Sequence, residues 1–562
     1  MMARGRAGIP SGSNTALWRL ALMVAVTSVG VPSMAAERTV YFAKVRTTLD
    51  HLIRHGRDRY GKTHSPLFAA ILAADTLDCP EDPPTYALDP LRLDPGRYAN
   101  RRAPGGCNLA YDQAMLRSMA IMTQVTGDAR YRQAATDALG WLLKHAENPH
   151  GLPVLGGHTY WHFYREEMAA QGDHHELWNW PMAWELWWAA DADGTRRYAD
   201  LVWKWHVVDK KTGETNRHSD GKPGWAFTFT DATFISLWSF VGAQTGDDTY
   251  RTWCETVAGY HWNRRNPKTN LFPSSGGRSA SNSKRWDGND FTTMQSVLAH
   301  HLIVAGRRTR SDKLIAIGRA ILDAYAKYGY DAKTERFYAS LKLDGTPVKP
   351  DIERPPVTAQ GQPVGYLAIW QPHAGWHELP LPMAQAYAWA AEVVDKDAYL
   401  QTAERFGRVL RKAWEDRYAG CADWSAFADA MKSDPKLLES YKKGVSKQRY
   451  RQAPGADAKR VAAYKKGGYV YQAPFGLFAD HYGRMIQFGL SMHRLTGDGD
   501  WLDLARQVAD AAIKELWRGK IFVGHVAKQH YYNTDHVGIL LYALLQLDAA
   551  MSGGKPEIDM FF

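Results

Sequence analysis

Apolar residues recur at the spacing of α-helices in many segments of the chain. Two segments show the pattern clearly, because their apolar residues fall on one helical face: Tyr131, Ala134, Ala135, Ala138 and Leu142, and Trp501, Leu504, Ala505, Val508 and Ala512. Each segment follows a glycine, an aspartate and an aromatic residue, as in "TGDARY" and "TGDGDW". Glycine permits the left-handed residue that ends a helix, and aspartate accepts hydrogen bonds from the N–H groups that begin the next one. The pattern therefore predicts repeated helix–turn–helix units.

These units are spread along the chain at intervals of roughly 50–100 residues, which favours a closed ring over an open solenoid, whose repeats are usually shorter and more regular. We predict an all-α fold, an (α/α)n toroid or barrel of roughly six or seven helical pairs with rim loops and minor β structure. The first helix of each pair is expected to face inward. The longer connections are expected to lie at one rim, where sites are usually built.

The first residues have the composition of a targeting segment. Three arginines precede or open an apolar run over 20–31, and the small residues "SMA" end at Ala35. This arrangement is typical of a secretory signal peptide, and the apolar run is too short to span a membrane. We predict a signal peptide over 1–35 and a single catalytic domain over 36–562. The mature chain is expected to be periplasmic or secreted, without membrane insertion.

The formal net charge is +10, and it becomes +7 without the three arginines of the signal peptide (10 − 3 = 7). A basic exported chain suits a polyanionic partner, and no basic-aromatic recognition module occurs in the sequence, so we expect an acidic polysaccharide rather than nucleic acid. A net charge that only keeps the protein soluble is the alternative interpretation. A basic stretch at about 425–468 has little periodicity. It is expected to be an exposed insertion, either a solvated loop or a substrate clamp.

The four cysteines are Cys79, Cys107, Cys254 and Cys421, and they include no CxxC pair, which argues against a zinc knuckle. In an oxidising compartment Cys79 and Cys107 could form a disulfide. Four buried free thiols are the alternative, and the sequence leaves both open.

Two islands of the chain gather residues that could bind a metal. The first contains "GGH" and "HHEL", and the second is "NRHSDG". Imidazole and carboxylate together suit a transition ion such as Mn, Co, Ni or Zn. The candidate ligands are His158, His162, His174, His175, Glu176 and His218. Taken alone, each histidine favours a structural role, and "HEL" recurs at His377, so Glu176 is also open to a structural interpretation. Because the candidates cluster in the sequence, a metal site becomes as strong an interpretation as a structural role.

Arg217 and His218 are adjacent, and the following Asp220 and Gly221 indicate a turn rather than a helix. Adjacent residues in a loop or strand point to different sides, so one could face a metal while the other faces a substrate. A surface pair in a polar loop is the alternative interpretation.

The motifs "GGH", "HEL" and "NRH", in this order, resemble those of the family 2 pectate lyases, bacterial enzymes with an (α/α)7 barrel that cleave polygalacturonate by β-elimination. The step of 41 residues from Glu176 to Arg217 and the immediate His218 also fit that pattern, as does "YGKTHSPLF" near the start of the chain. The similarity is clearest over about 105–225. The chain departs from the pattern in a shorter step from "GGH" to the glutamate and in an extra pair of histidines before it.

This resemblance implies that His158, Glu176 and His218 are metal ligands and that Arg217 is the Brønsted base. It also implies a divalent transition metal, Mn, Co or Ni rather than Ca. The implied chemistry is coherent, because the C5 proton of a uronate is α to a carboxylate and a metal on that carboxylate stabilises the charge that develops. Arginine is an unusual base, since its guanidinium is normally protonated. His175, His174 or Tyr160 could serve as the base if Arg217 only binds the substrate.

Cations and aromatic rings are what a uronate-binding cleft requires. The loop "SSGGRSASNSKRWDGND" supplies Arg278, Lys284 and Arg285, and an arginine can bind a carboxylate through two hydrogen bonds. Lys62 is a further candidate. Tryptophans cluster just after Glu176, where Trp180 is our candidate for stacking on a sugar, and most of the others are expected in the core.

The sequence therefore predicts an exported, metal-dependent polysaccharide lyase that acts on an acidic uronate polymer, with pectate or polygalacturonate as the first choice. One alternative is a glycoside hydrolase or sugar epimerase on a similar toroid. A hydrolase would need two facing carboxyl groups, and the pairs Glu176 with Glu378 and Asp287 with Asp535 can be proposed. The other alternative is a non-catalytic protein that binds acidic glycans.

Overall fold

The computed structural model describes residues 38–81, 103–157, 159–170, 175–178, 182–277, 292–348, 366–367, 369–370, 379–417, 477–526 and 528–553. The chain divides into two compact units, Met1–Glu37 and Arg38–Phe562, and the first lies wholly outside the described residues. The predicted signal peptide and the basic insertion at about 425–468 also lie outside them, so both stay predictions.

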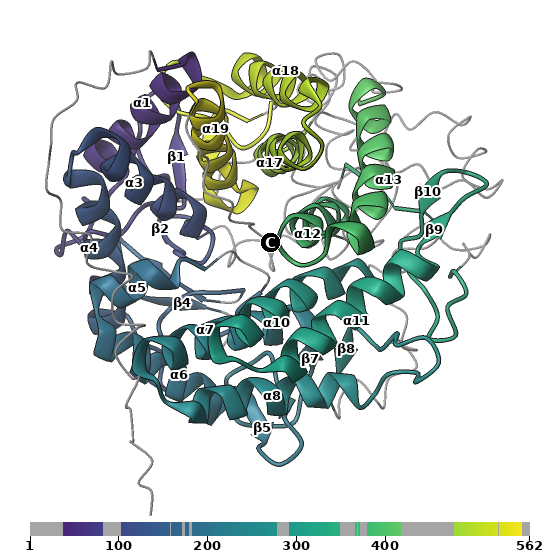
Figure 1. Ribbon diagram of the computed structural model, residues 1–562. Helices are drawn as coiled ribbons and strands as arrows, with labels where there is room; N and C mark the ends of the chain where they lie inside the picture. Colours follow the sequence, from purple (N-terminus) through teal and green to yellow (C-terminus); the bar gives the residue numbers. More distant parts are fainter. Residues whose placement is uncertain are drawn as a thin grey trace, which may run out of the picture. The chain divides into compact units, whose positions relative to one another are not determined.

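Within Arg38–Phe562 the described helices form an inner and an outer layer, as Figure 1 shows. The inner helices are α3 (Gln113–Thr126), α5 (Trp184–Ala190), α7 (Thr228–Thr245), α10 (Gln295–Thr309), α12 (Pro380–Val393), α17 (Ala479–Thr496) and α19 (Val537–Met551). The outer helices are α1 (Val40–His55), α4 (Arg130–His145), α6 (Ala192–His206), α8 (Asp248–Trp262), α11 (Asp312–Tyr328), α13 (Lys396–Glu415) and α18 (Gly499–Leu516). The predicted all-α class is confirmed, with seven inner–outer pairs among the described residues.

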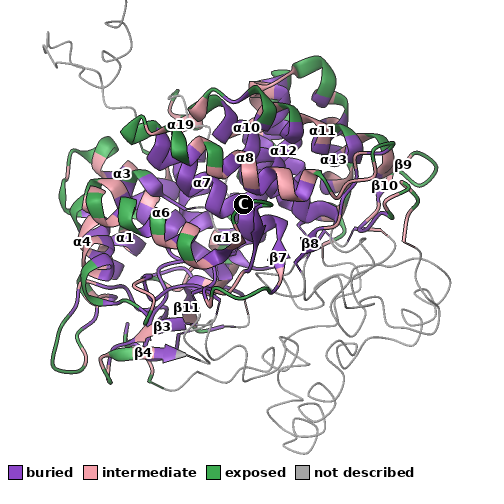
Figure 2. Ribbon diagram, turned by 90° about the horizontal axis from the view of Figure 1, so that it is seen from below, coloured by how far each residue is buried: buried purple, intermediate pink, exposed green. Residues whose placement is uncertain are grey.

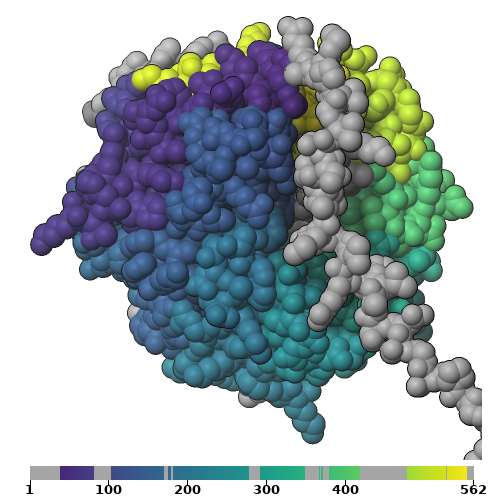
Figure 3. Space-filling view, turned by 60° about the vertical axis from the view of Figure 1, so that its left-hand side comes forward, coloured from purple at the N-terminus to yellow at the C-terminus, as the bar shows by residue number. Residues whose placement is uncertain are grey.

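The inner layer closes on itself. Helices α7, α10, α12, α17, α19 and α3 pack one against the next, and α19 also contacts α1, so the two ends of this unit meet (Figure 3). The short α5 fills the step between α3 and α7. The Trp187 indole donates to the side chain of Gln113 at 2.9 Å, and the Trp184 indole donates to Ser236 at 3.1 Å.

The two layers differ because their sequences differ. Every residue of α19 from Val537 to Asp548 is buried, so the helix is surrounded by protein on all sides. In α13 the buried residues recur at helical spacing on one face, and most of the remaining positions are polar or charged. The all-round apolar helices therefore line the inside, and the amphipathic ones cover them.

The turns between paired helices follow the predicted pattern, a glycine that ends one helix and an aspartate that begins the next. Gly127, Gly246 and Gly497 end inner helices with φ of 75°, 72° and 72°, in the left-handed region. The carboxylates of Asp247 and Asp498 then accept from backbone N–H groups of the next helix at 2.9 Å each. Both parts of the predicted pattern are confirmed: the glycine ends one helix, and the aspartate caps the start of the next.

Replacing Gly246 by alanine is expected to destabilise the fold by about 1–2 kcal/mol, because an L-residue is strained in the left-handed region even where the added methyl group meets open space. Gly259 is a matched control, since a Cβ there also meets no atom within 4 Å but the residue lies inside α8 with an ordinary φ. Gly259→Ala is expected to stabilise by about 0.5–1 kcal/mol. Calorimetric midpoints that shift in the same direction for both variants would contradict this account.

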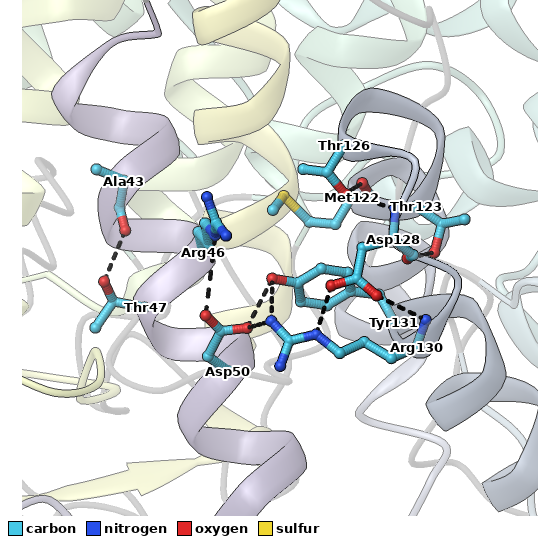
Figure 4. A network of polar contacts seen from close by, with 10 residues as sticks. All are labelled: Ala43, Arg46, Thr47, Asp50, Met122, Thr123, Thr126, Asp128, Arg130 and Tyr131. Atoms are coloured by element: carbon cyan, nitrogen blue, oxygen red, sulfur yellow. Dashed lines mark hydrogen bonds and ion pairs between the residues drawn. The ribbon is translucent and has the colours of Figure 1, made fainter.

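A polar cluster fastens α1 to the turn between α3 and α4 (Figure 4). The guanidinium of Arg130 donates to Asp128 and to Asp50 at 2.6 Å each, and the hydroxyl of Tyr131 donates to Asp50 at 2.7 Å. The helix that begins this unit is thereby held against the first helical pair.

Short strands gather at one end of the helices, where Figure 2 shows β3, β4, β7, β8 and β11. An antiparallel sheet joins β2 (Gly106–Cys107), β3 (Thr159–His162) and β4 (Glu167–Ala170). Two-stranded ladders pair β1 (Ile71–Ala73) with β11 (His530–Tyr532), β5 (Val207–Asp209) with β6 (Glu214–Thr215), β7 (Ala226–Phe227) with β8 (Ser275–Gly276), and β9 (Tyr330–Asp331) with β10 (Arg336–Phe337). The predicted minor β structure is confirmed.

The described cysteines, Cys79, Cys107 and Cys254, are buried free thiols, and burial raises the pKa of Cys79 to about 12. Of the two interpretations left open for Cys79 and Cys107, the structure has the free thiols, while Cys421 lies outside the described residues. Among the described helices none is both long enough and apolar enough to cross a membrane.

Candidate active site

Glu176 lies in a short extended segment, residues 175–178, ahead of α5. The two carbonyl oxygens that follow it in the chain accept hydrogen bonds from the hydroxyls of Thr230 and Thr233, at 2.9 and 2.6 Å. Both threonines belong to the first two turns of α7. The segment that carries Glu176 is therefore fixed to the beginning of an inner helix, at the end of the unit where the strands gather.

The two glycines of "GGH" approach Glu176 more closely than residues with side chains could. Gly156 has a φ of +122°, and a Cβ there would lie 2.1 Å from the carbonyl oxygen of Glu176. A Cβ on Gly157 would lie 2.3 Å from Oε2 of its carboxylate. The side-chain amide of Asn108 donates to the carbonyl of Gly156 at 2.8 Å and accepts from its N–H at 3.1 Å, which fixes the turn. His158, which follows, lies outside the described residues, so its role as a ligand stays a prediction.

Replacing Gly157 by alanine is expected to push the Glu176 carboxylate aside, because the new methyl group would overlap Oε2. A displacement of about 1 Å at a reacting centre can cost about 100-fold in turnover, which is the loss we expect. Gly140→Ala is the control, since the nearest atom to a Cβ there lies at 3.7 Å. The measurement is kcat beside the thermal midpoint. Full turnover in Gly157→Ala would show that the carboxylate position does not matter.

The "NRH" motif forms a turn around the side chain of Asn216. Its amide oxygen accepts from the backbone N–H of His218 at 3.2 Å and of Trp225 at 3.3 Å. The N–H of Arg217 donates to the carbonyl of Trp225 at 2.8 Å. Gly224 is required here, because a Cβ at that position would lie 2.2 Å from Asn216. The predicted turn is confirmed, and it leads directly into β7 and α7.

The two islands meet at Glu176. A guanidinium nitrogen of Arg217 lies 3.1 Å from Oε1, and Nε2 of His218 lies 4.0 Å from the same oxygen. The Glu176 side chain is fully buried, whereas those of Arg217 and His218 are 22% and 24% exposed, so the carboxylate is reached from outside through these two groups. Arg217 also lies over the ring of Phe227, with 5.2 Å between guanidinium carbon and ring centroid.

Arg217 and His218 therefore do not divide between two sides as expected for an extended chain. Both approach the same carboxylate oxygen. The reason is the tight turn around Asn216, which removes the alternation of a strand. A buried carboxylate requires such compensation, because an isolated charge away from water is costly.

Part of the predicted metal site fits the structure. Two ligand atoms that each lie about 2.1 Å from one ion are at most about 4.2 Å apart, and Oε1 of Glu176 and Nε2 of His218 are 4.0 Å apart. A carboxylate and an imidazole are also the donors that a transition ion prefers. Within the described residues no group of three His, Cys, Asp or Glu side chains forms a complete site. An ion bound here would need a third ligand from elsewhere, and it would share the carboxylate of Glu176 with Arg217.

The alternative bases have other roles in the structure. His175 is fully buried, and its two ring nitrogens lie 2.9 Å from a ring nitrogen of His206 and 2.7 Å from the hydroxyl of Tyr198. Tyr160 is 6% exposed and packs in an apolar cluster that includes Tyr532, and burial raises the pKa of its hydroxyl. His175 has no exposed surface from which it could contact a substrate. His174 lies outside the described residues.

The remaining candidates have other contacts in the structure or lie outside the described residues. His162 belongs to β3, where its Nδ1 accepts from the N–H of Arg165 at 3.3 Å. Lys62 is exposed, and its backbone N–H donates to the carboxylate of Glu166. Four candidates for substrate binding lie outside the described residues: Arg278, Lys284, Arg285 and Trp180. Asp287 and Glu378 of the hydrolase hypothesis also lie outside them.

Two asparagines complete the site and were not among the candidates. Asn108 fixes the glycine turn beside Glu176, and Asn216 shapes the turn that carries Arg217. Asn216 has a signal in the sequence, because it begins "NRH" and asparagine commonly shapes turns through its side chain. Asn108 has none, since it lies 48 residues from its partner Gly156.

Three solved structures are similar to this chain over most of its length. A D-mannose isomerase is 11% identical, with a TM-score of 0.45, and the match covers 92% of this chain and 99% of that one. An unsaturated glucuronyl hydrolase specific for heparin is 9% identical, with a TM-score of 0.42 and coverage of 92% and 99%. A sugar epimerase from a ruminal bacterium is 9% identical, with a TM-score of 0.43 and coverage of 89% and 98%.

The sequence comparison is more specific. Residues 96–239 match the family model described as periplasmic pectate lyase. The matched segment contains Glu176, Arg217 and His218, which the structure brings together. The resemblance to the family 2 pectate lyases predicted from the three motifs is thereby confirmed, and over residues 96–239 the chain is similar to the periplasmic pectate lyases.

Proposed function

We propose that the protein is an exported, metal-dependent polysaccharide lyase that cleaves an acidic uronate polymer by β-elimination, with pectate or polygalacturonate as the first candidate substrate. The observation that carries this proposal is the approach of Arg217 and His218 to the buried carboxylate of Glu176, from two islands 41 residues apart. The match to periplasmic pectate lyases over the same residues supports it.

In this proposal Glu176 and His218, with His158, bind a divalent ion, Mn, Co or Ni in preference to Ca. The bound ion would neutralise the carboxylate of the uronate and stabilise the charge that develops when C5 loses its proton. Arg217 lies beside this position and accepts the C5 proton. The C5–H electrons then form the C4=C5 double bond, and O4 leaves and takes up a proton.

The ion pair between Arg217 and Glu176 bears on this role. Arg217 lies 3.1 Å from this carboxylate, and an arginine guanidinium is normally protonated, which is the form that cannot accept a proton. A base role for Arg217 therefore requires that Glu176 share its charge with a second cation. This requirement is why we assign a metal-dependent reaction to the site.

The test is an absorbance assay, because β-elimination creates a conjugated double bond that absorbs ultraviolet light. Purified protein is incubated with polygalacturonate, alginate, glucuronan and ulvan, with Mn and with a chelator. We expect absorbance to grow on one of these polymers, and chelation to abolish it until Mn is restored. Reducing ends without absorbance would indicate a hydrolase, and bound but uncut polymer would indicate a glycan-binding protein.

His218→Ala is expected to weaken Mn binding, measured by calorimetric titration, because it removes a proposed ligand atom. His145→Ala is the control, since His145 is an exposed histidine at the end of α4. Equal Mn affinity in the two variants would exclude His218 as a ligand.

A further inference from the structure

Three buried side chains link the segment that carries Glu176 to the turn that carries Arg217 and His218. The hydroxyl of Tyr198 lies 2.7 Å from Nε2 of His175, and Nδ1 of His175 lies 2.9 Å from Nε2 of His206. Nδ1 of His206 lies 2.8 Å from the carbonyl oxygen of Asn216. Tyr198 and His206 belong to α6, while His175 directly precedes Glu176 and Asn216 directly precedes Arg217. We call these three side chains the histidine relay.

Hydrogen-bond chemistry sets the direction of the relay. The carbonyl of Asn216 can only accept, so Nδ1 of His206 carries a proton. In a neutral ring Nε2 of His206 is then an acceptor, and Nδ1 of His175 has to donate to it. Nε2 of His175 is left as an acceptor for the hydroxyl of Tyr198. Each bond in the series is therefore satisfied by one arrangement of protons, with both rings neutral.

Burial supports neutral rings. His175 and His206 have no exposed surface, and Tyr198 is 1% exposed. Burial lowers the pKa of His206 to about 4. Because none of the three side chains reaches the surface, none can touch a polysaccharide or its reacting atoms.

We propose that His175, His206 and Tyr198 are positioning residues that hold the segment of Glu176 and the turn of Arg217 and His218 at their working separation. This inference rests on the proposed function and deepens it. One further bond ties the same two islands, since the backbone N–H of His175 donates to the hydroxyl of Ser219 at 3.0 Å. The relay thus acts on Arg217 through the backbone of Asn216, and on Glu176 through that of His175.

Removing the hydroxyl of Tyr198 tests the relay with the smallest change. Without that donor, His175 is free to move its proton to Nε2, and its Nδ1 can no longer donate to His206. We expect Tyr198→Phe to lower kcat by about 10- to 100-fold, the range seen when outer-shell partners of a site are removed, with KM within about twofold. Tyr131→Phe is the control, because Tyr131 is as buried as Tyr198 and its hydroxyl also donates a hydrogen bond. Its acceptor is the carboxylate of Asp50, in a polar cluster that contains no residue of either island (Figure 4).

A double-mutant cycle separates positioning from general loss of stability. The amide of His206→Asn can still donate toward Asn216 but cannot reach His175, so it breaks the relay at its middle. If the two residues act in one relay, kcat of the double variant should be no lower than that of the worse single variant. Independent, multiplying losses of kcat, or a Tyr198→Phe variant as active as Tyr131→Phe, would overturn the proposal.

A measurement without substrate distinguishes failure of the relay from failure of the proposed lyase activity. In protein with nitrogen-15 histidine, long-range couplings should show His175 and His206 as neutral rings protonated at Nδ1. His261 is an internal reference for the other tautomer, because its Nε2 lies 2.6 Å from the carboxylate of Asp231 and so carries the proton. Rings protonated at Nε2 in His175 or His206 would overturn the relay even in an active enzyme. An inactive wild-type protein with the predicted tautomers would overturn the function and, with it, the positioning role, while the hydrogen bonds would stand.

Discussion

Replacing Arg217 by alanine is expected to lower kcat on the uronate polymer by about 100- to 10,000-fold, the usual contribution of a positioned general base. The guanidinium of Arg217 approaches the buried Glu176 from the partly exposed side of the site, where a substrate has access. KM should change less than kcat, because the group is proposed to act on the C5 proton during the reaction. The measurement is the initial rate of absorbance increase with Mn present.

The alanine variant also leaves the carboxylate of Glu176 without its cation, which by itself can destabilise a buried site by about 3–5 kcal/mol. Arg217→Lys separates the two effects, because an ammonium can keep the ion pair while losing the shape of the guanidinium. Arg494→Ala is the matched control. Arg494 is 23% exposed and binds Glu392 at 2.9 Å, but it lies in the last turn of α17, away from the end where the site is built. If kcat of Arg217→Ala equals that of Arg494→Ala, Arg217 takes no part in the reaction.

The fold could be predicted from the sequence because its determinants are local. The stop at Gly246 and the start at Asp247 are neighbours in the chain, and a left-handed glycine followed by a capping aspartate has the same meaning in any helical hairpin. The apolar face of each outer helix is equally local. Repetition of these signals was enough to predict paired helices in a ring.

The site was predictable only in part, because some of its determinants are contacts between residues far apart in the chain. The meeting of Glu176 with Arg217 and His218 followed from motifs whose order and spacing carry information. What each histidine does depends on partners that no spacing reveals. His175 was a candidate ligand and an alternative base, yet its ring bonds to His206, 31 residues away. The joint approach of Arg217 and His218 also depended on the Asn216 turn, which replaces the alternation of an extended chain.

Asp535, one of the carboxyl groups of the hydrolase hypothesis, is another residue whose role could not be predicted from the sequence pattern. It was a candidate carboxyl group, but its side chain is fully buried and forms an ion pair with the ammonium of Lys528, which is also fully buried. A Cβ on Gly524 would lie 2.2 Å from Oδ2 of Asp535, so the backbone packs directly on the carboxylate. The ammonium also lies 4.0 Å from the ring centroid of Tyr532. The geometry is that of an internal ion pair between Lys528, just before β11, and Asp535, just before α19.

Asp535→Asn is therefore expected to destabilise the protein by about 3–5 kcal/mol, because it leaves the ammonium of Lys528 buried without its counter-charge. The measurement is the calorimetric midpoint, which should fall markedly. Replacing both partners, with Lys528→Met added, should restore most of the loss, since removing a buried pair entirely is often close to neutral. At temperatures where the single variant stays folded, the rate of product formation should be close to that of the wild type. A variant with an unchanged midpoint and no activity would instead give Asp535 a catalytic role and revive the hydrolase hypothesis.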